Sequence, residues 1–203
     1  MRRVSFDVLV STLQQQRQSA ERTIVAVAGP PGAGKSTFSR KLAGALPNSA
    51  ILQADGFHYD DALLDEMGMR HRKGAPDTFD VDGLDVMIGR VGRRERVFAP
   101  TFDRRLEIAR AAAIEIDAER QYVIVEGNYL AFDLPPWNRL RKHFDCVVFI
   151  DAPRDELERR LVQRWTNLGL RPEEVRRHVA DNDLLNVDAV LSQSSNFDFV
   201  ISG

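Results

Sequence analysis

One short stretch has the residue types and spacing needed to hold a triphosphate. Residues 29–36 read Gly-Pro-Pro-Gly-Ala-Gly-Lys-Ser and satisfy the pattern G-x-x-x-x-G-K-[ST] at every position. Glycines let successive backbone N–H groups curl around phosphate oxygens, and the helix that follows presents its N-terminus to the anion. Lys35 is expected to reach the β- and γ-phosphates, and the Ser36 hydroxyl to bind Mg²⁺. We expect nucleotide contacts from Gly29, Pro30, Pro31, Gly32, Ala33, Gly34, Lys35, Ser36 and Thr37.

This phosphate loop (residues 29–36) does not by itself say how the nucleotide is used. Proteins that carry it include GTPase switches, motor and transporter ATPases, and small-molecule kinases. The chain contains neither the guanine-binding sequence Asn-Lys-x-Asp nor the transporter signature Leu-Ser-Gly-Gly-Gln. These absences favour the kinase class. The alternative is an ATP-binding regulatory switch of kinase fold without kinase activity.

Acidic residues follow several apolar runs. Asp55 comes directly after the run at 50–54, where a kinase needs a carboxylate to orient the acceptor hydroxyl and receive its proton. A turn or cap aspartate before Gly56 is an equally good interpretation of Asp55 from local sequence. His58, taken alone, is expected to have a structural or surface role.

Two further carboxylates compete for a role at the metal. Glu126 follows the apolar run at 122–125, and Asp151 follows the run at 146–150. Asp151 is followed by Ala-Pro, which is typical of a helix start with proline in the first turn. We therefore prefer Glu126 as the metal-site carboxylate and keep Asp151 as the alternative.

Arginines are concentrated on a predicted helix at 153–168. Charged helix positions are most often a solvated face with i,i+4 partners, but phosphoryl transfer also benefits from an arginine that a lid brings over the nucleotide. Periodicity does not distinguish among the four candidates, which are Arg154, Arg159, Arg160 and Arg164.

These residues must be positioned by an alternation of strands and helices. Continuous apolar runs predict buried parallel strands, and helical periodicity fills the segments between them, which indicates an α/β fold with ligands at the carboxyl ends of the strands. The predicted strands are 23–28, 50–54, 122–125, 146–150 and 197–201, and the predicted helices are 5–19, 35–46, 81–94, 106–118, 137–142, 153–168 and 172–181.

Composition narrows the class of protein. A chain of 203 residues fits one domain, and a net charge of −2 gives no global field for binding nucleic acid. No apolar run approaches the roughly 20 residues of a membrane helix, and no secretory leader is visible. The single cysteine, Cys146, is expected to be buried, so a cytoplasmic location fits best. The helix at 5–19 could cover the sheet or contribute to a homodimer, although its polar stretch Gln14-Gln15-Gln16 favours a solvated face.

Several of these segments together resemble the family of uridine kinase, phosphoribulokinase and bacterial pantothenate kinase. The shared segments are the phosphate loop, Asp55-Gly56-Phe57-His58 and the stretch at 126–130. The resemblance is greatest to a bacterial branch of nucleoside-kinase-like or "fructose transport system kinase" proteins, which shares the stretch at 72–80, Arg164-Trp165 and the segment at 181–186. It covers residues 22–200, nearly the whole chain.

The resemblance implies a three-layer α/β/α kinase with a five-stranded parallel sheet, ATP as donor and Mg²⁺ as cofactor. The single domain, 1–203, would comprise an N-terminal helix within 1–21, acceptor-site regions at 56–80 and 100–105, and a lid at 153–170. The acceptor would be a small metabolite with a hydroxyl group, such as a sugar, a nucleoside or a pantothenate-like molecule.

The resemblance also implies roles for individual residues. Asp55 becomes the acceptor-orienting base and Arg164 the favoured lid arginine. Phe102 replaces a substrate-binding tyrosine of the family, which casts doubt on a uridine-like pocket. Asn182 and Asn186 would line the adenine side, with a cap or turn role as the alternative. The candidate acceptor contacts are His58, Arg72 and Asp77, with Asp103 and Arg104 as weaker candidates.

Overall fold

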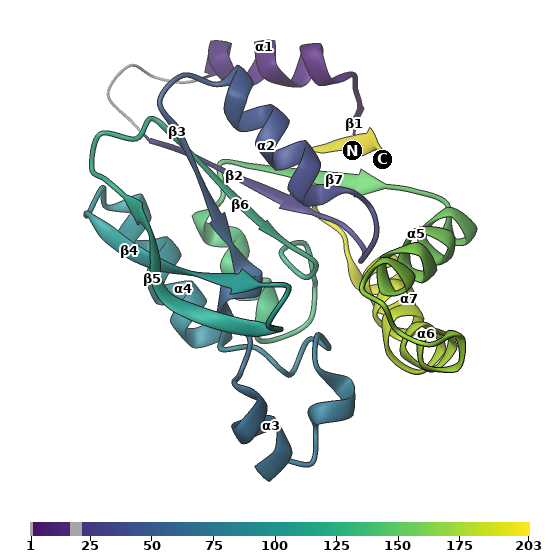
Figure 1. Cartoon of the computed structure of the whole chain (residues 1–203). Helices are drawn as coiled ribbons and strands as arrows, with labels where there is room; N and C mark the ends of the chain where they lie inside the picture. The colour runs from purple at the N-terminus through teal and green to yellow at the C-terminus, as the bar shows by residue number, and fades with distance from the viewer. Residues whose placement is uncertain (1, 17–21) are drawn as a thin grey trace.

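A six-stranded parallel sheet forms the centre of the molecule (Figure 1). The structure is a computed structural model that describes residues 2–16 and 22–203. All five predicted strands are confirmed, but the expectation of a five-stranded sheet is wrong, because Arg2 and Arg3 pair with the last strand and add a sixth. The strand order is β1 (Arg2–Arg3), β8 (Phe199–Ser202), β7 (Cys146–Asp151), β2 (Thr23–Ala28), β6 (Tyr122–Gly127) and β3 (Ser49–Gln53).

Helices cover both faces of the sheet. Alternate residues of β2 point to opposite sides: Val25 and Val27 pack with α1 and α2, whereas Ile24 and Ala26 pack with α4 and the 3₁₀ helix η3. Further helices cluster beyond the end of β7 (Figure 1). Their bounds are α1 (Phe6–Gln16), α2 (Lys35–Ala45), α4 (Val81–Gly92), η3 (Trp137–His143), α5 (Arg154–Asn167), α6 (Pro172–His178) and α7 (Leu184–Gln193).

The helix predicted at 106–118 is wrong. That segment is strand β5 (Ile108–Ile116), which forms an antiparallel hairpin with β4 (Val97–Asp103). Its alanines favour a helix, but pairing with β4 and burial of Ile116 opposite Val97 outweigh that local preference. The hairpin lies beside η1 (Ala54–Phe57), the 3₁₀ turn after β3.

Other segments also differ from the prediction. The helix expected at 172–181 ends at His178 and continues as a π-helical turn, η4 (Val179–Asp183), before α7. Two short elements between β3 and α4, α3 (Asp61–Glu66) and η2 (Arg70–Arg72), were not predicted. The N-terminal helix ends at Gln16, and the remainder of its predicted span, 17–19, lies outside the described residues. Among the described residues no helix is long and apolar enough to cross a membrane.

Candidate active site

The phosphate loop joins β2 to α2 with a backbone path that needs glycine. Gly29 has φ 148°, and a Cβ atom there would lie 2.6 Å from the carbonyl oxygen of Ile150 on the neighbouring strand β7. The Lys35 ammonium donates to the carbonyl oxygen of Pro30 at 2.9 Å, inside the curve of the loop. Burial lowers the pKa of Lys35 to about 8, although Asp55 and Glu126 act in the opposite direction. The loop thus has the shape and charge to accept phosphates.

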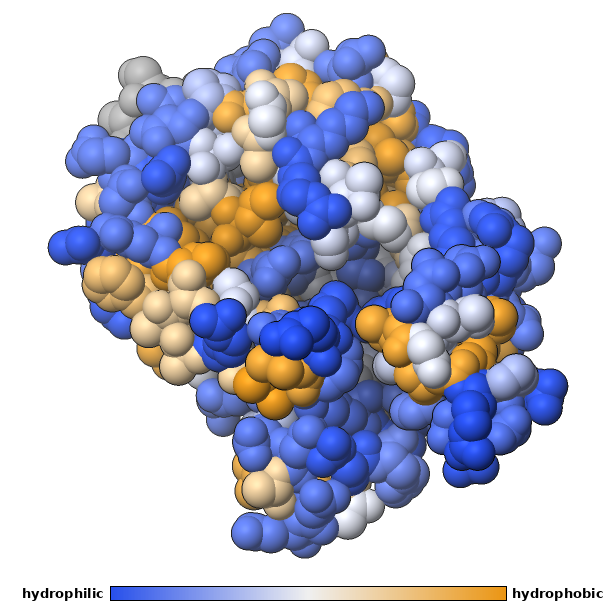
Figure 2. Space-filling model, in the orientation of Figure 1, coloured by the Kyte–Doolittle hydropathy of each residue, from blue (hydrophilic) through white to orange (hydrophobic). Residues whose placement is uncertain are grey.

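A cavity of about 1150 Å³ opens over the phosphate loop. Its walls come from the loop, η1, the segment at 70–74, the β4–β5 hairpin, α5, α6 and η4. Figure 2 shows the opening as a hollow between the body of the sheet and the α5–α6 lobe, bordered by both hydrophilic and hydrophobic residues. The predicted site residues that line the cavity are Pro31, Gly32, Gly34, Lys35, Ser36, Thr37, Asp55, His58, Arg104, Glu126, Arg164, Asn182 and Asn186.

Asp55 is held by the hairpin. Its Oδ2 accepts a hydrogen bond from Nη2 of Arg104 at 2.5 Å, across 49 residues of sequence. Burial would raise the pKa of Asp55, but the positive charges of Arg104, His58 and Lys35 outweigh that effect and hold it below its usual value. The carboxylate is therefore ionised at neutral pH and can orient a hydroxyl group and accept its proton.

His58 supports the same corner of the cavity. Its Nδ1 lies 2.7 Å from the carbonyl oxygen of Asp55, and its ring packs against Phe79 and Phe102. Burial lowers the pKa of His58. The contacts thus give His58 a packing role beside Asp55, and its direct contact with an acceptor stays a prediction.

The two predicted metal ligands lie together. Glu126, only 7% exposed, accepts a hydrogen bond from Nε2 of Gln53 at 3.1 Å. Burial and then the charge of Asp55 raise the pKa of Glu126, while the Ser36 hydroxyl stabilises its ionised form. Kinases bind Mg²⁺ with one or two protein oxygens and the substrate phosphates, so this pair fits the ion. Asp151 pairs with Arg3 at 2.7 Å and does not line the cavity, which favours Glu126.

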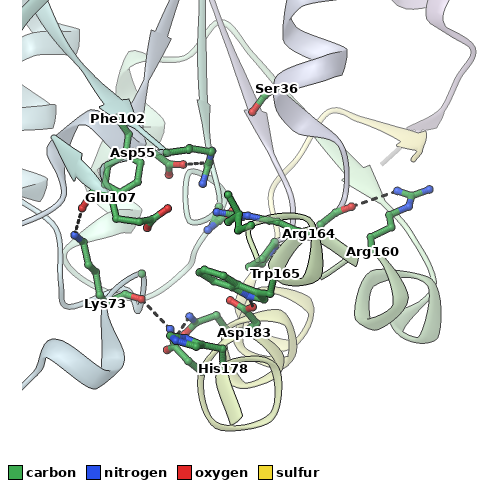
Figure 3. Close-up of a pocket in the computed structure, with 18 of the residues that line it drawn as sticks. Ser36, Asp55, Lys73, Phe102, Glu107, Arg160, Arg164, Trp165, His178 and Asp183 are labelled. Carbon is green, nitrogen blue, oxygen red and sulfur yellow. Dashed lines mark hydrogen bonds and ion pairs between the residues drawn. The ribbon is translucent and has the colours of Figure 1, made fainter. Parts of the chain in front are cut away.

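Among the candidate lid arginines, Arg164 has a distinctive environment. Its guanidinium carbon lies 5.3 Å from the ring centroid of Trp165, and burial lowers the pKa of Arg164. Trp165 stacks on His178 and donates its indole N–H to Asp183 at 2.5 Å (Figure 3). Arg154 instead pairs with Asp188 outside the cavity, whereas Arg159 and Arg160 line it and pair with Glu156.

Arg72 does not line the cavity. It donates to Oδ1 of Asn182 at 2.9 Å and to Oδ1 of Asn186 at 3.2 Å, so it ties the segment at 70–74 to η4 and α7. This pairing places both asparagines next to the acceptor-site segment, and their predicted adenine contact stays a prediction. Asp77 is exposed and lies outside the cavity lining. Asp103 is outside the lining too and accepts from two backbone N–H groups of the hairpin turn.

Several polar residues of the cavity were not among the predicted site residues, including Lys73, Glu107, His178 and Asp183. Lys73 donates to Oδ1 of Asp61 at 2.5 Å and to the carbonyl oxygen of Glu107. A loop lysine or glutamate is usually a solvated surface residue, so local sequence gave no signal that Lys73 or Glu107 would line the cavity. Hydrophobic periodicity likewise did not predict the π-helical turn that places Asp183 at the cavity.

Comparisons with known proteins show a family and solved structures that this chain resembles. The family model described as AAA domain matches residues 24–188. A crystal structure described as a fructose transport system kinase from Silicibacter sp. TM1040 superposes with a TM-score of 0.92 and 37% identity, covering 97% of this chain and 98% of that one.

Two curated proteins are similar over nearly the whole chain. Protein YggC of Escherichia coli (strain K12) is 35% identical over 198 residues, which is 95% of this chain and 81% of the relative. A Schizosaccharomyces pombe protein described as a uridine kinase is 29% identical over 212 residues, covering 97% and 90% of the two chains.

Proposed function

The chain belongs to the P-loop kinases of the uridine kinase, phosphoribulokinase and pantothenate kinase group, and on that premise we propose that it transfers the γ-phosphoryl group of ATP to a hydroxyl group of a small molecule. The observation that supports this most directly is the placement of an ionised Asp55 in the same cavity as Lys35 and Arg164. A phosphate-binding loop with a carboxylate at its side has the two halves of a phosphoryl-transfer site.

Each of these residues has a proposed role in the transfer. The acceptor oxygen attacks the γ-phosphorus, the bond from the γ-phosphorus to the β–γ bridging oxygen breaks, and ADP leaves. Asp55 orients the acceptor hydroxyl and takes its proton, while Lys35 and Arg164 neutralise charge on the phosphates. Mg²⁺, which Ser36 and Glu126 would hold, supplies further neutralisation of the phosphate oxygens when bound. Closure of α5 over the cavity would exclude water and limit wasteful hydrolysis of ATP.

An acceptor screen tests the proposal. ATP consumption is measured with the wild-type chain against sugars, nucleosides and vitamin precursors, with a reaction lacking acceptor as the baseline. We expect low ATPase activity alone and clear stimulation by at least one acceptor. Binding of ATP with no acceptor-stimulated turnover across the panel would instead support the regulatory-switch alternative, against which the presence of both Asp55 and Glu126 argues.

A variant at Asp55 tests its role. Asp55→Asn keeps the shape of the side chain but cannot take a proton, so turnover should fall by about 10²- to 10⁴-fold while ATP affinity is retained. Asp65→Asn, at an exposed carboxylate 3.6 Å from Arg70, is the matched control and should keep full activity. Full kinase activity in Asp55→Asn would refute this assignment.

A further inference from the structure

One carboxylate in the cavity has an oxygen that the described part of the chain leaves unpartnered. Glu107 lies in the turn of the β4–β5 hairpin, and its Oε1 is shielded from solvent with no hydrogen-bond partner among the described residues. Its backbone φ is 55°, in the left-handed region that non-glycine residues seldom adopt. The Lys73 ammonium donates to the Glu107 carbonyl oxygen and fixes the turn. In Figure 3 the side chain extends from the hairpin into the pocket, near Asp55 and Phe102.

Three of the cations around this carboxylate are already paired with aspartates, and a fourth, Arg164, is assigned above to the phosphates of ATP. Arg104 is bound to Asp55 at 2.5 Å, and Lys73 is bound to Asp61 at 2.5 Å. Arg70 pairs with the same Asp61 at 2.7 Å. An acceptor carrying a carboxylate or phosphate group would have to break one of these pairs, or compete with ATP for Arg164, to find a counter-charge beside Glu107. It would also approach the negative charges of Asp55 and Glu107.

The state of Glu107 favours a ligand that donates hydrogen bonds. Burial raises the pKa of Glu107, although the charges of Arg164, Arg104 and Lys73 act in the opposite direction. A poorly solvated carboxylate gains most from charge-assisted hydrogen bonds, and a hydroxyl group can donate one without bringing a negative charge. Asp55 would serve the hydroxyl that is phosphorylated, and Glu107 a second hydroxyl on the same molecule.

We propose that Glu107 is a specificity-determining residue that binds a hydroxyl group of the acceptor, and that the acceptor is a neutral polyhydroxylated molecule: a sugar, a polyol or the ribose of a nucleoside. This inference rests on the kinase activity proposed above. It goes beyond that activity because it excludes hydroxy acids and sugar phosphates as the preferred acceptors.

The first part of the test compares two sets of acceptors with the wild-type chain. The neutral set is D-ribose, D-fructose, D-mannitol and uridine, and the anionic set is D-glycerate, D-pantothenate and D-ribulose 5-phosphate. We expect the highest kcat/KM from a neutral compound. A higher kcat/KM for an anionic compound overturns the role of Glu107 and leaves the kinase proposal intact. If no compound of either set stimulates turnover, the proposed function itself fails, and the inference fails with it.

The second part uses Glu107→Gln with the best neutral acceptor. Loss of the charged hydrogen bond should raise KM for the acceptor about tenfold or more, with KM for ATP within about twofold of wild type. The melting temperature should not change, because the carboxylate oxygen that is removed bonds to no described residue. Glu115→Gln is the control, since Glu115 on the same hairpin pairs with exposed Arg96. An unchanged acceptor KM in Glu107→Gln overturns the proposal.

Discussion

The two halves of the cavity are built in different ways. The nucleotide half is one continuous stretch, residues 29–37, whose shape follows from its own backbone. The acceptor half brings together Asp55, the segment at 70–74, the hairpin turn at 102–107, and the asparagines of η4 and α7. Its contacts span 49 residues between Arg104 and Asp55 and 114 between Arg72 and Asn186. The nucleotide half therefore depends on local conformation, and the acceptor half depends on packing between distant segments.

Core aromatic residues hold the acceptor half in place. The Tyr129 hydroxyl donates to the Gly74 carbonyl oxygen at 2.6 Å, and the Trp137 indole N–H donates to the Pro76 carbonyl oxygen at 2.9 Å. Both aromatic side chains are fully buried. Because the two halves are built differently, a substitution in one half should change the binding of its own substrate more than the binding of the other.

The largest effect is expected in the nucleotide half. Lys35→Met removes the charge that faces the β- and γ-phosphates, so kcat/KM for ATP should fall by about 10²- to 10³-fold or more. Folding should be retained because the methionine side chain is about as long as that of lysine and its apolar character suits the buried position. Steady-state kinetics and ATP binding by calorimetry measure the effect. Near-normal turnover would show that the phosphate loop is not the site of phosphoryl transfer.

The next effect should appear in the acceptor half at Gly56. A Cβ atom there would lie 2.7 Å from the carbonyl oxygen of Pro100, so Gly56→Ala must push the hairpin away from η1. We expect a loss of about 1–3 kcal/mol of stability and an acceptor KM raised about tenfold, with ATP affinity unchanged. Gly44→Ala is the control, because its Cβ meets nothing within 4 Å and alanine favours the helix. A larger effect on ATP affinity than on acceptor KM would show that the two halves of the cavity do not respond separately to substitution.

A moderate effect is expected from Arg72, which acts only through long-range contacts. Arg72→Gln removes the charged donor to Asn182 and Asn186, which should loosen the segment at 70–74 and raise acceptor KM about five- to tenfold. Chemical denaturation and acceptor titrations provide the readout. Arg93→Gln is the control, at an exposed arginine paired with Glu95. An equal change in the control would show that Arg72 has no special position.

The pH dependence of ATP binding tests the role of Lys35 in the nucleotide half. Burial lowers the pKa of Lys35 to about 8, and phosphate binding needs the protonated ammonium. The Kd for ATP should therefore rise above pH 8, by at most about tenfold per pH unit, and respond little to this group below pH 8. Titrations at constant ionic strength measure the slope. In Lys35→Arg the guanidinium stays charged, so a slope that persists there would assign it to another group.

The smallest effect is expected at Asp77. The sequence made this residue a candidate acceptor contact, but its side chain is exposed and outside the cavity lining. Asp77→Asn should change acceptor KM by less than about twofold, as surface substitutions usually do. A tenfold rise measured with the acceptor found in the screen would mean that the acceptor half extends further than the cavity does.

The sequence by itself determined five of the six strands of the parallel sheet and the nucleotide half. Strands buried on both faces must be continuous apolar runs, so Thr23–Ala28 and Cys146–Asp151 could be recognised without their partners. The phosphate loop is a local backbone motif with fixed residue types. Asp55 and Glu126 were found because the carboxyl ends of parallel strands meet at one edge of the sheet.

Only the tertiary structure decided how the acceptor half is assembled. Ile108–Ile116 is rich in alanine and was predicted as a helix, yet it is a strand because Val97–Asp103 pairs with it. That hairpin brings Arg104 to Asp55 and directs Glu107 into the cavity. The contacts of Arg72 with Asn182 and Asn186 depend likewise on a π-helical turn more than 100 residues away. Local periodicity records which side chains share a face of one element, but not which distant element will pack against it.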